Sequence, residues 1–236
     1  MRNQCLGLIG GLGIGATMHY YRDLTMSSRA SGQPLNLLIA HANLTQVFAY
    51  VRARDKKGLA HYLNEFICSM SAAGATIAAI SAITPHLALD ELHAICPLPI
   101  IGVFEPLKQA IAERGIRRVT VFGTGFVMGS GLFGRLPIVE IVMPQAQEVE
   151  IIDAIYTQLT VDGEAGDDHH TMLTMLAHAI LTRERIDVIV LAGTEFSLVF
   201  KEANTDFPAL DCARLHLSSI KQAIGIEKSA RAEVKF

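Results

Sequence analysis

The chain lacks the cysteine patterns and long apolar runs that mark several large classes of protein. Its four cysteines, Cys5, Cys68, Cys96 and Cys212, include no C-x-x-C pair, which argues against a disulfide framework or a zinc site. We expect them to be reduced thiols of a cytoplasmic protein. No apolar run approaches the roughly 20 residues that a membrane helix needs. The first residues also lack the separate apolar region of a signal peptide.

An excess of charge of one sign is also missing. The formal net charge is -3 and the pI is about 6.3, so we expect no nucleic-acid partner and no membrane partner. The glycine-rich residues 10–15 resemble a dinucleotide-binding loop only loosely. No acidic residue ends the next strand, which leads into His41-Ala42-Asn43, and no Walker lysine is present. We predict no cofactor.

Short apolar runs alternate with longer amphipathic stretches along the 236 residues. Strands that are apolar on both sides and alternate with helices are typical of a parallel sheet covered on both faces. The predicted strands span residues 5–9, 35–40, 76–81, 99–103, 119–123, 138–143 and 188–192. The predicted helices span residues 16–29, 59–73, 106–114, 149–159, 170–183 and 212–224.

The pattern repeats in two halves. In each half one strand ends in a glycine turn, namely Gly10-Gly11-Leu12-Gly13 and Gly123-Thr124-Gly125. A later strand ends in Ala82-Ile83-Thr84-Pro85-His86 in the first half and in Gly193-Thr194-Glu195 in the second. Ligands of open parallel sheets bind beyond the carboxyl ends of strands, so two facing halves would place these four turns around one cleft. Their backbone N–H groups favour an anion such as a carboxylate, although the glycines alternatively serve only tight turns.

Five segments carry a family resemblance. They are GLIGGLG at 7–13 with the AT and YYR that follow, AITPH at 82–86, GTGFVM at 123–128, AGTE at 192–195 and PALDCARLH at 208–216. In this order they resemble the motifs of the Asp/Glu/hydantoin racemase family over nearly the whole chain. The resemblance implies an α/β fold of two pseudo-symmetric flavodoxin-like subdomains with parallel sheets and a cleft between them. We expect the subdomains to be residues 1–100 plus 210–236, and residues 101–209.

The resemblance also implies a chemistry. Members of the family use no cofactor, most are dimers, and two residues, usually cysteines, face opposite sides of the substrate α-carbon. One removes the α-proton as a thiolate and the other returns a proton from the other face. We therefore expect a homodimer that binds a small carboxylate or amino acid.

This chain departs from the family pattern at both proton-transfer positions. The motif C-N-T-x-H becomes Ala82-Ile83-Thr84-Pro85-His86, and Gly193 stands where the second cysteine belongs. Neither a methyl group nor a hydrogen atom can carry a proton, so conventional two-cysteine racemisation is not expected. Glu195, at the start of a helix, and His86, whose family counterpart mostly supports the site, are weak candidates for acid–base work.

The remaining candidates are hydrogen-bonding groups near the turns. The groups expected to bind substrate are Gly11, Asn43, Thr84, Thr124, Ser130 and Thr194. The run Asp167-Asp168-His169-His170 has metal-ligand residue types, but we interpret it as a helix N-cap with exposed histidines and predict no metal site.

Three functional hypotheses follow from the sequence. The first is an isomerase/racemase-like or lyase-like enzyme with altered chemistry. The second is a catalytically inactive protein that kept a carboxylate-binding cradle. The third is a hydrolytic or metal-dependent activity that uses His41, His86 or residues 167–170.

Overall fold

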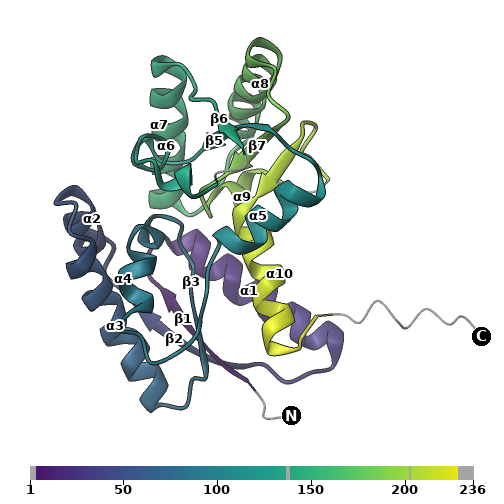
Figure 1. Cartoon of the computed structure of the whole chain (residues 1–236). Helices are drawn as coiled ribbons and strands as arrows, with labels where there is room; N and C mark the ends of the chain where they lie inside the picture. Colours follow the sequence, from purple (N-terminus) through teal and green to yellow (C-terminus); the bar gives the residue numbers. More distant parts are fainter. Residues whose placement is uncertain (1–3, 137–138, 202, 228–236) are drawn as a thin grey trace, which may run out of the picture.

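Two parallel four-stranded sheets form the framework of the molecule (Figure 1). The computed structural model describes residues 4–136, 139–201 and 203–227. The first sheet has the order β2-β1-β3-β4, with β1 (Cys5–Gly10), β2 (Asn36–His41), β3 (Ile77–Ile80) and β4 (Ile100–Ile101). The second has the order β6-β5-β7-β8, with β5 (Arg118–Phe122), β6 (Glu140–Ile141), β7 (Val188–Leu191) and β8 (Ala209–Asp211). Because both sheets share one strand order, the predicted two-subdomain α/β fold is confirmed.

Helices connect the parallel strands, as parallel pairing requires. Around the first sheet they are α1 (Ile14–Ser31), α2 (Leu44–Arg52), α3 (Lys56–Ala72), the 3-10 helix η1 (Thr84–Ala88) and α4 (Leu89–His93). The second half contains α5 (Phe104–Glu113), α6 (Gly125–Gly129), the 3-10 helix η2 (Leu132–Arg135), α7 (Ala146–Asp162), α8 (Asp167–Glu184) and α9 (Phe196–Val199), and α10 (Cys212–Ile224) follows. Within the described ranges, no helix is long and apolar enough to span a membrane.

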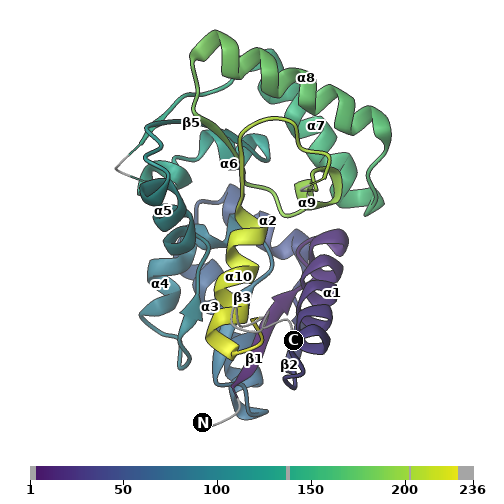
Figure 2. The same ribbon diagram turned by 90° about the vertical axis from the view of Figure 1, so that its right-hand side faces the viewer.

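The final helix returns to the first sheet (Figure 2). Its residues Leu217 and Ile220 are buried beside Leu6 and Leu8 of β1. Asp211 starts this helix, because its side chain accepts hydrogen bonds from the backbone N–H groups of Ala213 at 2.8 Å and Arg214 at 3.1 Å. Helix α10 therefore passes from the last strand of the second sheet to the core of the first subdomain.

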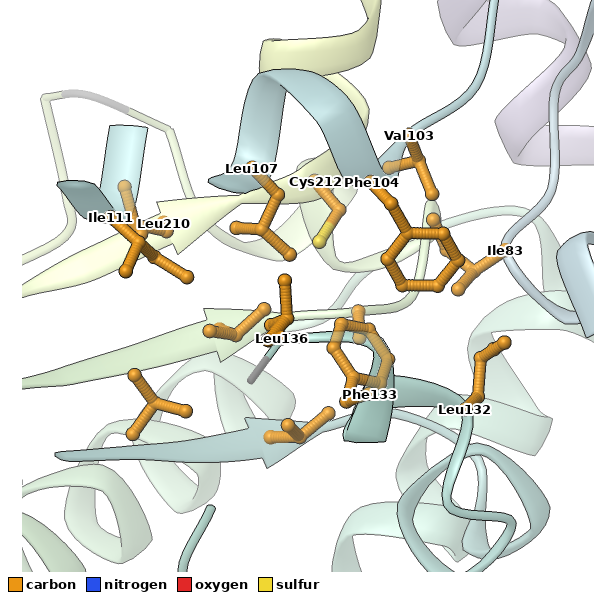
Figure 3. Packing of buried hydrophobic residues seen from close by; sticks show 14 of the residues in the cluster. Ile83, Val103, Phe104, Leu107, Ile111, Leu132, Phe133, Leu136, Leu210 and Cys212 are labelled. Atoms are coloured by element: carbon orange, nitrogen blue, oxygen red, sulfur yellow. The ribbon is translucent and has the colours of Figure 1, made fainter. Parts of the chain in front are cut away.

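A second feature of the junction is an apolar cluster that contains side chains from both halves (Figure 3). Phe104 of α5 packs edge to face against Phe133, with ring centroids 5.6 Å apart, and Ile83 lies in the same cluster. The thiol of Cys212 points into this cluster, and burial raises its pKa well above the ordinary value. Cys212 is thus packed as a small apolar side chain.

Several elements differ from those predicted. Strand β8 was not predicted, nor were the helices α2, α4, α6 and α9. Strands β4 and β6 are only two residues long, and Ile138, at the start of the run predicted as β6, lies outside the described residues. Each of the missed helices α4, α6 and α9 has five residues or fewer, too few to show a helical period. The division at residues 100/101 and 209/210 stays a prediction.

Candidate functional site

A cavity of about 170 Å³ lies between the two subdomains, beyond the carboxyl ends of β1, β3 and β5. Its apolar wall is formed by Leu12, Leu44, Val47, Phe48, Ala82, Ile83, Pro85 and Val161. The lining residues that carry hydroxyl groups are Thr84, Thr124, Tyr156, Thr157 and Thr160. None of these lining residues has an acidic, basic or imidazole side chain. The described part of the cavity is therefore an apolar space with hydroxyl groups as hydrogen-bonding partners.

The first wall is the turn after β3, where Ala82 and Ile83 are both buried. His86 lies behind this turn and does not line the cavity. Its Nδ1–H donates to the carbonyl oxygen of Ala82 at 2.9 Å, and its Nε2 accepts from the N–H of Val103 at 3.4 Å. Burial lowers the pKa of His86 to about 3. The ring is therefore neutral and holds the turn in place.

A second buried histidine, His216, packs against His86. The ring centroids of His216 and His86 lie 5.9 Å apart. Nε2–H of His216 donates to the carbonyl oxygen of Ile101 at 2.8 Å, and its Nδ1 accepts from the hydroxyl of Tyr20 at 3.0 Å. Burial lowers its pKa to about 4. This neutral network joins α1, β4 and α10 behind the wall that carries Ala82.

On the side of the second subdomain the cavity is lined by Tyr156 of α7, whose ring lies against Gly193 in the turn after β7. A Cβ atom added to Gly193 would lie 2.7 Å from Cδ2 and 2.9 Å from Cζ of Tyr156, and closer still to Cε2. These separations are far below van der Waals contact, so the ring occupies the space that a side chain at position 193 would need. Tyr156 also lines the cavity. Tyr156 was not among the predicted site residues, because no sequence motif places it near position 193.

Glu195 is fully buried next to Tyr156. Its Oε2 accepts hydrogen bonds from the hydroxyl of Tyr156 and from Oγ1 of Thr194, the latter at 3.0 Å. A Cβ atom on Gly13 would lie 3.1 Å from Cδ of Glu195 and closer still to Oε1, so the carboxyl group abuts the N-terminus of α1. Within the described residues Oε1 makes no hydrogen bond. Glu195 thus reaches from the second subdomain to the first.

The same surroundings perturb both acidic groups. Burial raises the pKa of Glu195, and the hydrogen bonds from Tyr156 and Thr194 act in the opposite direction. Burial, followed by the negative charge of Glu195, raises the pKa of Tyr156 well above its usual value. The tyrosine is therefore a neutral phenol that donates its proton toward the glutamate.

The predicted substrate-binding residues fall into different places. Thr84 and Thr124 line the cavity, and Thr194 lies behind Tyr156 at Glu195. Oγ1 of Thr124 also accepts from the N–H of Val127 at 3.0 Å, which caps α6 and leaves its own hydroxyl proton available.

Gly11, Asn43 and Ser130 do not line this cavity. The N–H of Gly11 donates to Oγ1 of Thr17 at 3.0 Å. The side chain of Asn43 caps α2. Ser130 lines a separate cavity of about 430 Å³ together with Arg54. The structure therefore brings only part of the predicted cradle together.

Within the described ranges, no group of three or more His, Cys, Asp and Glu side chains is arranged so that it could hold a metal ion. The run 167–170 begins α8. His169 accepts from the N–H of Gly166 at 3.3 Å through Nδ1, and Nε2 of His170 lies 2.8 Å from the carbonyl oxygen of Asn204.

The sequence as a whole matches one family. Residues 9–220 match the model of the Asp/Glu/hydantoin racemase family. The chain belongs to this family. This racemase-family chain shares its fold with a candidate Asp/Glu racemase from Yersinia pestis, at 21% identity and a TM-score of 0.80, with 94% of this chain and 99% of that chain covered. An aspartate racemase homologue from Pyrococcus horikoshii OT3 has 23% identity and a TM-score of 0.80, with the same shares covered.

A more distant structure extends the likeness. The glutamate racemase of Francisella tularensis, solved with D-glutamate, has 12% identity and a TM-score of 0.61, with 98% of this chain and 86% of that chain covered. This chain differs from the family pattern at both cysteine positions. Ala82 lines one side of the cavity, and the ring of Tyr156 covers Gly193 on the other.

Proposed function

We propose that this chain is a cofactor-independent enzyme of the isomerase or lyase type, which binds a small carboxylate or amino acid in the cavity between its subdomains. The observation that carries this proposal is the position of the cavity at the carboxyl ends of strands of both sheets. Hydroxyl groups that can donate to a ligand belong to Thr84 of the first subdomain and Thr124 of the second. Such donors bind a carboxylate and stabilise an enediolate derived from it.

The proposed chemistry differs from two-cysteine racemisation. A racemase needs a proton-transfer group on each face of the α-carbon. Ala82 offers none on the first wall. Cys212 is packed in the apolar cluster instead of in the cavity lining. We therefore expect a reaction in which one face of the substrate suffices, such as stereospecific protonation of a carbanion.

The experiment combines binding with turnover. A thermal-shift screen of lactate, methylmalonate, succinate and both enantiomers of alanine, valine, aspartate and glutamate identifies ligands, because a ligand at 100 times its dissociation constant adds about 2.7 kcal/mol of stability. The hits are then incubated in deuterated water, and exchange of the α-proton is followed by mass spectrometry. Rapid interconversion of aspartate or glutamate enantiomers would refute the altered chemistry.

A second candidate function is binding without catalysis. The apolar surface at Ala82 and Ile83 favours it, because that wall can shape a ligand but cannot exchange protons with it. Stabilisation by a ligand without exchange or turnover would support this alternative. A screen without any stabilising ligand would contradict both candidates.

Two further properties remain proposals, the first because of the family and the second because of the scattered cysteines. We propose that the protein is a homodimer and that it acts in the cytoplasm. Sedimentation velocity of the purified chain tests the first, and a monomer at micromolar concentration would contradict it.

A further inference from the structure

The two walls of the cavity are chemically unequal. Ala82 ends one wall in a methyl group, whereas Tyr156 places a phenol in the other. The phenol ring occupies the space of the side chain that Gly193 lacks. Its hydroxyl is hydrogen-bonded to Glu195, which is fully buried. One wall thus contains a proton donor coupled to a second acid, and the other wall contains neither.

We propose that Tyr156, positioned by Glu195, is the catalytic proton-transfer residue of this cavity, and that the chain moves a proton on one face of its substrate only. This inference rests on the function proposed above and assigns the group that carries it out. Glu195 does not line the cavity, so it is a positioning residue that acts through the tyrosine.

The proton movements balance without another reactant. In the removal direction, the C–H bond at the substrate α-carbon breaks and an O–H bond forms on the phenol oxygen. The original phenol proton passes to the carboxylate of Glu195. The electron pair of the broken bond stays on the substrate as an enediolate, held by the hydroxyls of Thr84 and Thr124. The reverse sequence returns a proton, or a deuteron taken from solvent, to the same face.

The lining also limits the substrate class. Apart from the hydroxyl groups, the cavity is bounded by side chains such as Leu12, Val47 and Phe48, and no lining residue has a charged side chain that could pair with a second carboxylate. Burying an unpaired carboxylate is costly. The site therefore favours a small monocarboxylic acid with an apolar side group, such as alanine or valine, over aspartate or glutamate.

The test uses the full chain and α-proton exchange in deuterated water. Both enantiomers of alanine and valine are the probes, and chiral chromatography reads the configuration of each product. The central variant is Tyr156→Phe, which keeps the ring that fills the space at Gly193 and removes only the hydroxyl. Tyr21→Phe is the matched control, because Tyr21 is 46% exposed on α1 and lies outside the cavity.

We expect exchange of one enantiomer with retention of configuration. Tyr156→Phe should lower the rate by about 10² to 10⁴-fold, with ligand stabilisation retained, and Tyr21→Phe should not change it. In the wild-type chain the exchange rate should rise with pH as Glu195 ionises, and Glu195→Gln should remove this rise. If Glu195 had a purely structural role, the variant would keep the same pH dependence. Inversion of either enantiomer, an unchanged rate in Tyr156→Phe, or binding without exchange would overturn the assignment. If alanine and valine do not bind but another compound of the thermal-shift screen does, the substrate class inferred here is overturned, and if no compound of that screen binds the wild-type chain, the function proposed above is refuted.

Discussion

The close approach of Tyr156 to Gly193 makes Gly193→Ala the most informative perturbation. The new Cβ would lie 2.7 Å from Cδ2 of Tyr156, so the ring must move. Overpacking a buried site costs about 1–3 kcal/mol. Displacing the ring also removes the hydroxyl donor from the buried carboxyl group of Glu195, which costs about another 1–3 kcal/mol. We expect a loss near the middle of the combined range, about 4 kcal/mol, or about 8–16 °C in melting temperature for a chain of this size.

Urea denaturation in a double-mutant cycle measures this effect. Tyr156→Ala alone is expected to cost about 3 kcal/mol, because it removes a large, partly buried ring that packs against an apolar cluster. Gly193→Ala in that background should add little, since the methyl group enters the vacated space. The matched control is Gly134→Ala, because a Cβ there meets nothing within 4 Å. Additive costs for the two substitutions, or equal stability of Gly193→Ala and Gly134→Ala, would refute the steric reasoning.

The remaining predictions concern buried polar groups. Between pH 7 and pH 5 the free energy of unfolding should fall by about 2 kcal/mol for each of His86 and His216, because the unfolded chain takes up protons near pH 6.5 whereas the folded rings, with pKa values of about 3 and about 4, do not. Urea denaturation of Glu195→Gln at both pH values checks this, because the variant removes the opposite contribution of the raised pKa of Glu195. An equal free energy of unfolding at pH 7 and pH 5 would contradict the prediction. Asp211→Ala should cost about 2 kcal/mol, because it removes a helix cap and the partner of a buried serine hydroxyl. Asp55→Ala removes an exposed cap and should cost less in the same assay; equal costs would argue against the buried bond.

Much of the fold could be predicted because its signals are local. The apolar runs that became β1, β2, β5 and β7 lie at the predicted positions, and α10 has its predicted bounds. The short strand β8 has only three residues, and its place beside β7 depends on a long-range pairing that no local pattern encodes.

The site could be predicted only in part, for a related reason. The motifs located Ala82 and Gly193 and indicated that neither can transfer a proton. They did not indicate Tyr156, because its relation to Gly193 depends on how α7 packs against the turn after β7. An aromatic residue in the sequence pattern of α7 looks the same whether its ring packs in the apolar core or fills the space beside a glycine in another segment.

The return of α10 to the first sheet has a consequence for biosynthesis. One face of β1 is closed by Leu217 and Ile220, which the ribosome adds after every residue of the second subdomain. While the chain is being made, α1 contributes Tyr20 and Leu24 to this face, but the part that α10 covers stays exposed, although N-terminal domains ordinarily fold first. The last strand of the second sheet ends at Asp211, before α10 is made, so this sheet can form earlier. We infer that the subdomain synthesised first is the one completed last. A chain that ends before α10 would keep apolar surface exposed and would tend to aggregate.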